Sequence, residues 1–265
     1  MQLTESLHDH EHDHHDHEGH DHSRENQQQV LRVVILLGLA AYFGYNILSG
    51  NLTNYINERF AWLSYLAVGL FGIMGLTGLL SLLRGGHLHQ HDHDDHEHTS
   101  IGWGIMAIVA IPLLLGVLLP SKPLGAEAVD GNISSAPLTF GAANVLTKEP
   151  LQRNVLDWLR VFSKSETFTT FNDDQADVSG FIYREPGYPK DTFMVARFTV
   201  SCCVADASAI GLPVYLEASD VLETGGWVRV TGAFKAQEFG GKQAPVLIAA
   251  TVEEIEQPQH PYLYP

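Results

Sequence analysis

The chain has little of what several common protein classes require. Its 265 residues include only two cysteines, which are adjacent, so a framework of disulfide bonds is excluded. Only 17% of the residues are charged, the formal net charge is −16, and Lys and Arg form no cluster. Because nucleic-acid binding needs a basic surface, we expect no nucleic-acid partner. The soluble part also lacks a Ser/His/Asp set, paired catalytic acids, a phosphate loop and HExxH, so we expect no enzyme.

The composition divides the chain into blocks. Residues 1–29 hold eight acids, one base and eight of the 15 histidines, which predicts a disordered acidic tail. Residues 30–119 are mostly apolar, whereas residues 120–265 hold 18 acids and 11 bases in the manner of a soluble domain. We therefore expect a membrane domain and a soluble domain, joined by a linker over 120–136.

Three uncharged or nearly uncharged runs lie in the apolar block, at 30–48, 61–83 and 101–119. At a rise of about 1.5 Å per residue, each is long enough to cross a hydrocarbon core roughly 30 Å thick. The sequence thus predicts a membrane α domain of three transmembrane helices in contact with the lipid bilayer. None has an ionisable side chain deep in the span, so we do not expect this chain to translocate an ion by itself. Glycines recur every third residue in the second run. They indicate either a face that packs against another helix or the usual glycine content of membrane helices.

The predicted topology follows from the number of spans and from the basic residues beside them. Three spans place the N-terminal tail and the loop 84–100 on one side, and the C-terminal domain on the other. Arg24, Arg32 and Arg84 flank the first side, whereas Arg59 and Lys122 flank the second. This bias predicts a multi-pass protein of the plasma membrane with a cytoplasmic N-terminus and histidine loop, and an extracytoplasmic C-terminal domain.

Fourteen of the 15 histidines lie in two tracts, one in the tail and one in the loop 84–100. Neutral imidazole interleaved with carboxylates suits Zn²⁺, Ni²⁺ or Co²⁺, and the lack of Cys and Met in both tracts argues against a dedicated Cu(I) site. We predict a divalent metal cofactor, zinc first; a solvated or pH-responsive acidic tail is the alternative. The predicted ligands are His8, His10, His12, His14, His15, His17, His20, His22, His87, His89, His91, His93, His96 and His98.

The soluble domain is predicted over 137–256, followed by a tail at 257–265. An apolar face formed by Leu151, Val155, Leu156, Leu159 and Phe162 predicts a helix over 151–162. Runs rich in β-branched and aromatic residues predict five strands, at 178–185, 192–201, 213–218, 227–236 and 245–254. Five short strands with one helix predict a mainly-β domain, an OB-like barrel, with a bulge or bend at Gly232.

Chemistry in this domain centres on Cys202, Cys203 and Asp206, which are candidate metal or redox groups. Adjacent residues of a strand point to opposite faces, so the two cysteines can share a metal only if the backbone turns there. One buried structural cysteine with an incidental neighbour is the alternative. A structural ion pair between Arg197 and Asp206 is a further possibility.

Residues 30–256 resemble the YcgQ-like family of bacterial membrane proteins, which are described as candidate subunits of a two-part permease. The resemblance rests on the His-rich second loop between spans and on two strings, Pro112-Leu-Leu-Leu-Gly-Val-Leu-Leu-Pro-Ser-Lys-Pro-Leu124 and Arg197-Phe-Thr-Val-Ser-Cys-Cys-Val-Ala-Asp-Ala207. It implies a multispanning permease as partner and a link to zinc-responsive genes, but it supplies no catalytic residues. The tail tract at 8–22 is longer than is usual in that family.

Together these observations predict a membrane-anchored accessory subunit of a permease system that handles or senses a divalent metal. Two alternatives stay open. The first is a membrane-tethered OB-like module that recognises a protein or an envelope component. The second is a redox protein that uses Cys202 and Cys203.

Overall fold

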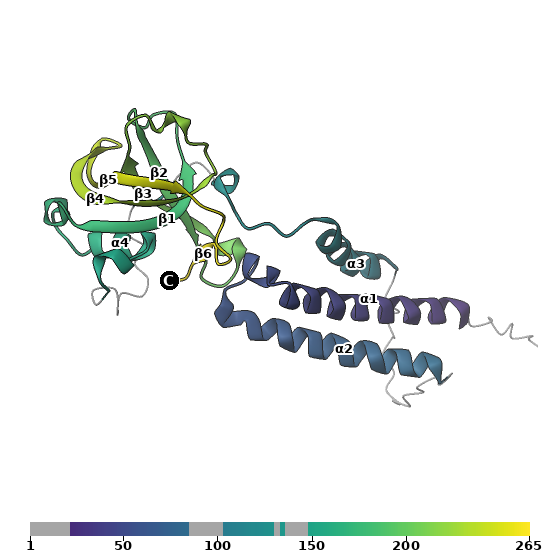
Figure 1. Ribbon diagram of the computed structural model, residues 1–265. Helices are drawn as coiled ribbons and strands as arrows, with labels where there is room; N and C mark the ends of the chain where they lie inside the picture. Colours follow the sequence, from purple (N-terminus) through teal and green to yellow (C-terminus); the bar gives the residue numbers. More distant parts are fainter. Residues whose placement is uncertain (1–21, 85–102, 130–132, 136–147) are drawn as a thin grey trace, which may run out of the picture.

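The computed structural model describes residues 22–84, 103–129, 133–135 and 148–265. Figure 1 shows a sheet domain at one end of a group of three helices: α1 (His22–Leu48), α2 (Ala61–Leu83) and α3 (Trp103–Leu118). Among the described residues, the segments Asn26–Leu48 and Glu58–Leu83 are long and apolar enough to cross a membrane, whereas α3 is apolar but shorter.

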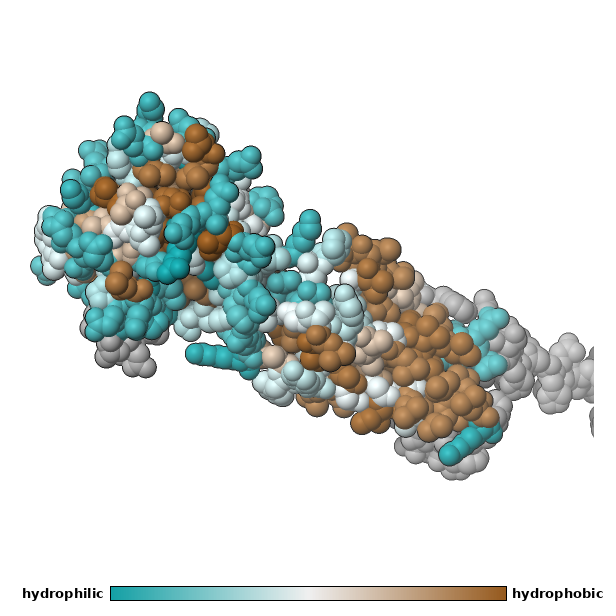
Figure 2. All heavy atoms as spheres, in the orientation of Figure 1, coloured by the Kyte–Doolittle hydropathy of each residue, from teal (hydrophilic) through white to brown (hydrophobic). Residues whose placement is uncertain are grey.

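The helices expose large apolar side chains along their length. Figure 2 shows this surface as a brown band over the helices, in contrast to the mostly teal sheet domain. Exposed apolar area of this extent is unfavourable in water and is matched by a bilayer or a partner. The structure therefore contains apolar helices suited to a membrane anchor, together with a separate β domain. Exposed members include Tyr45, Leu66, Ile73, Leu76, Ile108 and Leu114.

Glycines allow α1 to lie close to α2. A Cβ atom at Gly75 would lie 2.6 Å from Leu37 Cδ2, and one at Gly78 would lie 2.7 Å from Val33 Cγ2. Gly69 and Gly72 of the same strip meet no atom within 4 Å. The strip is thus a packing face towards α1 in its second half and is open in its first half.

The soluble domain contains one mixed sheet. Its strands are β1 (Gln175–Tyr183), β2 (Thr192–Thr199), β3 (Ser208–Tyr215), β4 (Trp227–Phe239), β5 (Lys242–Glu254) and β6 (Tyr262–Leu263). The order is β1-β4-β5-β3-β2-β6, and an additional β1–β2 pairing makes the first five strands a closed ring of neighbours. The β3–β5 and β2–β6 pairs are parallel, and the others are antiparallel.

All five predicted strands are present with shifted ends, the largest shift is at β3, and a sixth strand was not predicted. β3 begins at Ser208 rather than at Pro213, and all of its residues pair with β2. Gly211 and Pro213 usually interrupt strands, so the sequence contains no sign that the strand starts before them. The predicted tail at 257–265 contains β6, whose two residues pair with Phe198 and Thr199 of β2. So short a strand depends on its neighbour and leaves no pattern in the sequence.

The core of the domain forms around α4 (Val155–Phe162), whose eight residues are all buried. Trp158 packs against Phe162 and Phe234, with ring centroids 5.5 and 4.7 Å apart. The helix begins later than predicted, because Asn154 and Asp157 form a capping box at its start. Leu151 lies before it in a separate 3₁₀ turn, Pro150–Gln152, and is 59% exposed, so its predicted place on the buried face is wrong.

The predicted irregularity at Gly232 is confirmed. The register of β4 against β5 shifts between Thr231 and Gly232. A Cβ atom at Gly232 would collide with the carbonyl oxygen of Ile248 on β5. Because this neighbour is backbone, it cannot turn aside as a side chain can, so only glycine fits here.

We predict that Gly232→Ala lowers the free energy of unfolding of the full chain by about 1–3 kcal/mol, through overpacking against β5. Gly187→Ala is the matched control, because a Cβ atom there meets nothing within 4 Å. Thermal unfolding in mild detergent measures both. Equal midpoints for the two variants would contradict the tight approach at Gly232.

Three distant segments meet where the sheet domain joins the helices. The hydroxyl of Tyr262 accepts a hydrogen bond from the amide of Leu124 at 2.8 Å and donates to the carbonyl of Asn54 at 3.2 Å. Beside it, His260 Nδ1 lies 2.7 Å from Glu58 Oε1. The C-terminal residues thus link the loop after α1 to the segment after α3.

Arg197 holds these C-terminal residues from inside the domain. Its Nε donates to the carbonyl of Pro261 and its Nη2 to that of His260, each at 2.9 Å. Its guanidinium lies 5.0 Å from the ring centroid of Trp227. Burial lowers the pKa of Arg197 to about 10, which still leaves it cationic at neutral pH. Arg197 therefore binds carbonyl oxygens, and the alternative of an ion pair with Asp206 is wrong.

Candidate functional site

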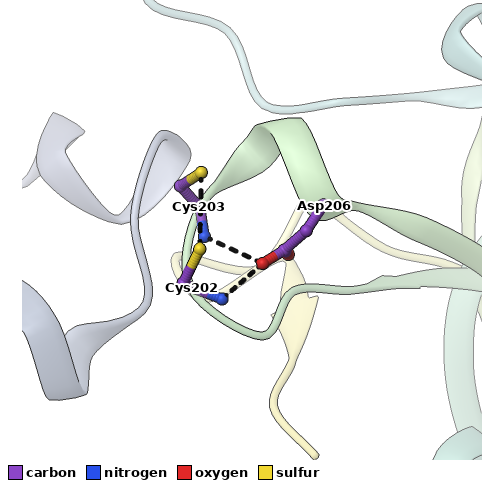
Figure 3. Close-up of side chains that lie close together, drawn as sticks. All are labelled: Cys202, Cys203 and Asp206. Atoms are coloured by element: carbon purple, nitrogen blue, oxygen red, sulfur yellow. Dashed lines mark hydrogen bonds between the residues drawn. The ribbon is translucent and has the colours of Figure 1, made fainter.

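Cys202, Cys203 and Asp206 lie in one turn between β2 and β3. β2 ends at Thr199, and a 3₁₀ turn, Val204–Asp206, follows the cysteines. Oδ1 of Asp206 accepts a hydrogen bond from the amide of Ser201 at 2.8 Å. Oδ2 accepts from the amides of Cys202 at 2.7 Å and Cys203 at 3.4 Å (Figure 3). One carboxylate therefore organises the whole turn, which we call the cysteine loop (residues 200–206).

The backbone turns at the two cysteines, which is the condition for both thiols to bind one metal ion. Because the backbone bends instead of continuing as a strand, the two thiols do not point to opposite faces. Their sulfur atoms lie 3.7 Å apart. One ligand atom from each of Cys202, Cys203 and Asp206 fits within 4.8 Å of the others. Both cysteines are free thiols, and in the described part of the chain this is the group of three that has the spacing for a metal ion.

Asp206 and Cys202 shift each other's pKa in opposite directions. Partial burial raises the pKa of the Asp206 carboxyl, but hydrogen bonds from the Cys202 thiol and from the three amides lower it overall. The hydrogen bond to Asp206, followed by that to Cys203, raises the pKa of the Cys202 thiol to about 11. Cys202 is therefore protonated at neutral pH and is a poor nucleophile, because the thiolate is the reactive form.

The cysteine loop is attached to the loop between α1 and α2. Ile56 pairs with Cys203 in an isolated β bridge. The amide of Asn57 donates to the carbonyl of Cys202 at 3.0 Å, and the amide of Val204 donates to that of Tyr55 at 2.8 Å. The loop between α1 and α2 and the cysteine loop thus form a small backbone ladder.

Asn57 adds side-chain hydrogen bonds to this ladder. It is 2% exposed, its Nδ2 donates to the carbonyl of Ser201 at 2.9 Å, and its Oδ1 caps the 3₁₀ turn Glu58–Phe60. The sequence analysis missed its role. The cap could have been found from Asn followed by Glu and Arg, but the bond to Ser201 joins residues 144 apart and leaves no local signal.

An apolar pocket of about 500 Å³ adjoins the thiols. Cys202 is exposed and Cys203 is partly buried, so both sulfur atoms are accessible from it. The other walls come from the last turns of α1, the connection that follows it and the first turns of α2. The lining residues are Phe43, Ile56, Phe60, Leu63, Ser64 and Ala67, with the two cysteines.

The predicted histidine ligands lie almost entirely outside the residues that the structure describes. Those at positions 8–20 and 87–98 lie outside the described residues, and His22 is the first residue of α1. The remaining histidine, His260, contacts Glu58 at the junction. Metal binding by the two tracts therefore stays a prediction.

The sequence matches known families over most of its length. Residues 31–134 match the DUF1980 N-terminal domain, and residues 142–265 match the DUF1980 C-terminal domain. A protein of Streptococcus mutans named "Putative two-component membrane permease complex subunit" is 26% identical, over 89% of this chain and 99% of its own length. The protein YcgQ of Bacillus subtilis, named UPF0703, is 22% identical, over 89% of this chain and 99% of its own length.

Among solved structures, the small single-stranded DNA-binding protein of Streptomyces coelicolor is 14% identical, with a TM-score of 0.23, over 32% of this chain and 94% of that one. A score of this size does not establish a shared fold. The two domain matches and the two full-length relatives agree with each other and with the predicted resemblance. The chain belongs to the DUF1980 family, which includes the YcgQ-like proteins.

Proposed function

We propose that the protein is a membrane-anchored accessory subunit of a permease system and that it handles or senses a divalent metal, with zinc as the first candidate. This proposal rests on one observation. The backbone ladder at residues 55–57 joins a group of helices with exposed apolar side chains to a folded β domain. The name of the S. mutans relative as a permease complex subunit supports the same function.

An accessory role agrees with the chemistry of the helices. Residues 33–48, 61–83 and 103–118 contain no Asp, Glu, Lys, Arg or His. Pathways for ions and protons through membranes are usually built from such groups. A transport pathway would therefore be supplied by a multispanning partner, and the exposed sides of α1, α2 and α3 offer apolar surface for it.

We further propose three spans and an OB-like barrel. α3 packs along α1, since Leu113 contacts Gly38 and the Tyr42 ring lies over Gly116. In Figure 1, α3 runs beside α1 and its C-terminal end leads back to the sheet domain. For the barrel, the support is the closed ring of five strands in which β1 pairs with both β2 and β4.

We predict that a topology reporter after Pro265 is active only outside the cytoplasm and that one within 84–100 is active only inside it. One span, at 101–119, separates these two points and so puts them on opposite sides of the membrane. The same pair of fusions in a chain lacking 101–119 is the control, and both reporters should then report the cytoplasmic side. Two reporters on one side of the intact chain would leave two spans, and an inverted pair would reverse the orientation.

We predict that a multispanning membrane protein co-purifies with the tagged chain in mild detergent. Gly72→Leu should reduce its recovery several-fold, because this position is open in the isolated chain and a partner helix can approach it closely. Gly44→Leu adds the same bulk at an equally open position of α1 and is the control. A chain that purifies alone would contradict the subunit role, and full recovery with Gly72→Leu would exclude this face.

The metal part of the proposal rests on the two histidine tracts. Two spans separate the tracts, so both would lie on the same side of the bilayer, where one ion can pass between them. Each site in such a tract is assembled from flexible chain, so ordering costs entropy and individual affinities should be modest. Many interchangeable sites of this kind are suited to collecting ions and releasing them.

We predict that the purified chain binds several Zn²⁺ ions at neutral pH and releases them near pH 5. Only a neutral imidazole has a lone pair free to bind a metal ion. Because the unperturbed pKa of histidine is about 6.5, most of these side chains are protonated near pH 5. Deleting 8–22 and replacing 87–98 with Gly and Ser should lower the stoichiometry, measured by equilibrium dialysis, whereas His260→Gln should not. Equal stoichiometry with and without the tracts would refute metal capture by them.

A further inference from the structure

We infer that Cys202, Cys203 and Asp206 form a metal site on the soluble domain, separate from the histidine tracts, that takes a zinc-class divalent cation through two sulfur atoms and one carboxylate oxygen. The three residues belong to one turn and are already close together. The inference goes beyond the proposed function, because it uses none of the tract histidines and can hold or fail without them.

The distance between the thiols fits tetrahedral coordination. Two Zn–S bonds of about 2.3 Å at the tetrahedral angle separate their sulfur atoms by about 3.8 Å. The observed distance between the Cys202 and Cys203 sulfur atoms is 3.7 Å. An ion can therefore bind both sulfur atoms while the loop keeps its conformation. Binding would replace the two thiol protons, which pass to solvent.

Asp206 keeps a lone pair available for a cation. A carboxylate offers about four acceptor positions, and the amides of Ser201, Cys202 and Cys203 occupy three of them. The Cys202 thiol bonds to the remaining position, so an ion that replaces the thiol proton would lie beside both sulfur and oxygen. A hard carboxylate next to two soft thiolates favours Zn²⁺ over Cu(I).

The site is held in place from two sides. Asp206 fixes the backbone of the cysteines from within the loop, and the Tyr55–Asn57 ladder fixes it from the membrane-proximal side. Little ordering is needed when an ion binds, so the affinity should exceed that of the flexible tracts. Since the ladder and the ligands share Cys203, a bound ion would also strengthen the join between the sheet domain and the helices.

Three protein ligands leave one position open. Zinc sites with four protein ligands are closed and structural, whereas sites with three keep a place for water or an incoming ligand. The described residues within reach supply only these three. The apolar pocket that adjoins the thiols gives access to that position from the membrane-proximal side. The geometry is therefore that of an exchangeable site rather than a permanent structural one.

The test is a Co²⁺ titration of the full chain in detergent, after reduction and a count of two free thiols. Co²⁺ takes zinc sites and shows sulfur-to-cobalt charge-transfer absorption only when a thiolate binds it, so the tract histidines do not interfere. We expect one equivalent to give this absorption and Zn²⁺ to abolish it. Cys202→Ser, which changes an exposed side chain, should remove most of the absorption without loss of thermal stability.

Asp206→Asn should weaken Co²⁺ binding at least tenfold, while Asp220→Asn, a control in the turn after β3, should leave it unchanged. Deletion of both tracts should leave the absorption intact, which separates this site from the proposed function. Absence of the absorption in chain with two free thiols would overturn the inference, as would its persistence in the Cys202→Ser/Cys203→Ser double variant. A freshly isolated chain whose cysteines are already joined would also overturn it and would assign the pair to redox chemistry.

Discussion

The backbone ladder between residues 55–57 and the cysteine loop is the contact on which the rest of the structure depends. It joins the loop after α1 directly to the sheet domain, and Tyr262 and His260 supplement it from the C-terminal residues. Its bonds are between backbone groups, and Asn57 adds buried side-chain bonds at its centre. Buried polar groups of this kind are costly to leave unpaired, so the two loops stabilise each other.

The same ladder determines where the sulfur atoms lie. Cys203 pairs with Ile56, and the first turns of α2 complete the pocket next to the thiols. The chemically distinctive residues of the soluble domain therefore lie where it meets the apolar helices and not on the far side of the sheet.

The C-terminal residues reinforce the join from a third direction. Arg197 binds the carbonyls of His260 and Pro261, and this places Tyr262 between Asn54 and Leu124. A guanidinium has five donors in a fixed plane, so one buried side chain can hold two consecutive carbonyls. The string from Arg197 to Ala207 thus has two separate structural roles, one at each end.

The sequence by itself determined the elements whose signals are local. Uncharged runs indicated the apolar helices, β-branched and aromatic residues indicated five strands, and Gly232 indicated the bulge. The tertiary structure decided what depends on residues far apart in the chain. It assigned Arg197 to the C-terminal carbonyls, Asn57 to the cysteine loop and β6 to the edge of β2. It also decided whether the two adjacent cysteines could bind one metal ion. The carboxylate of Asp206 accepts hydrogen bonds from three amides, and this turns the chain after β2. Local periodicity reflects which face of an element is buried, whereas a hydrogen bond across more than a hundred residues leaves no periodicity to detect.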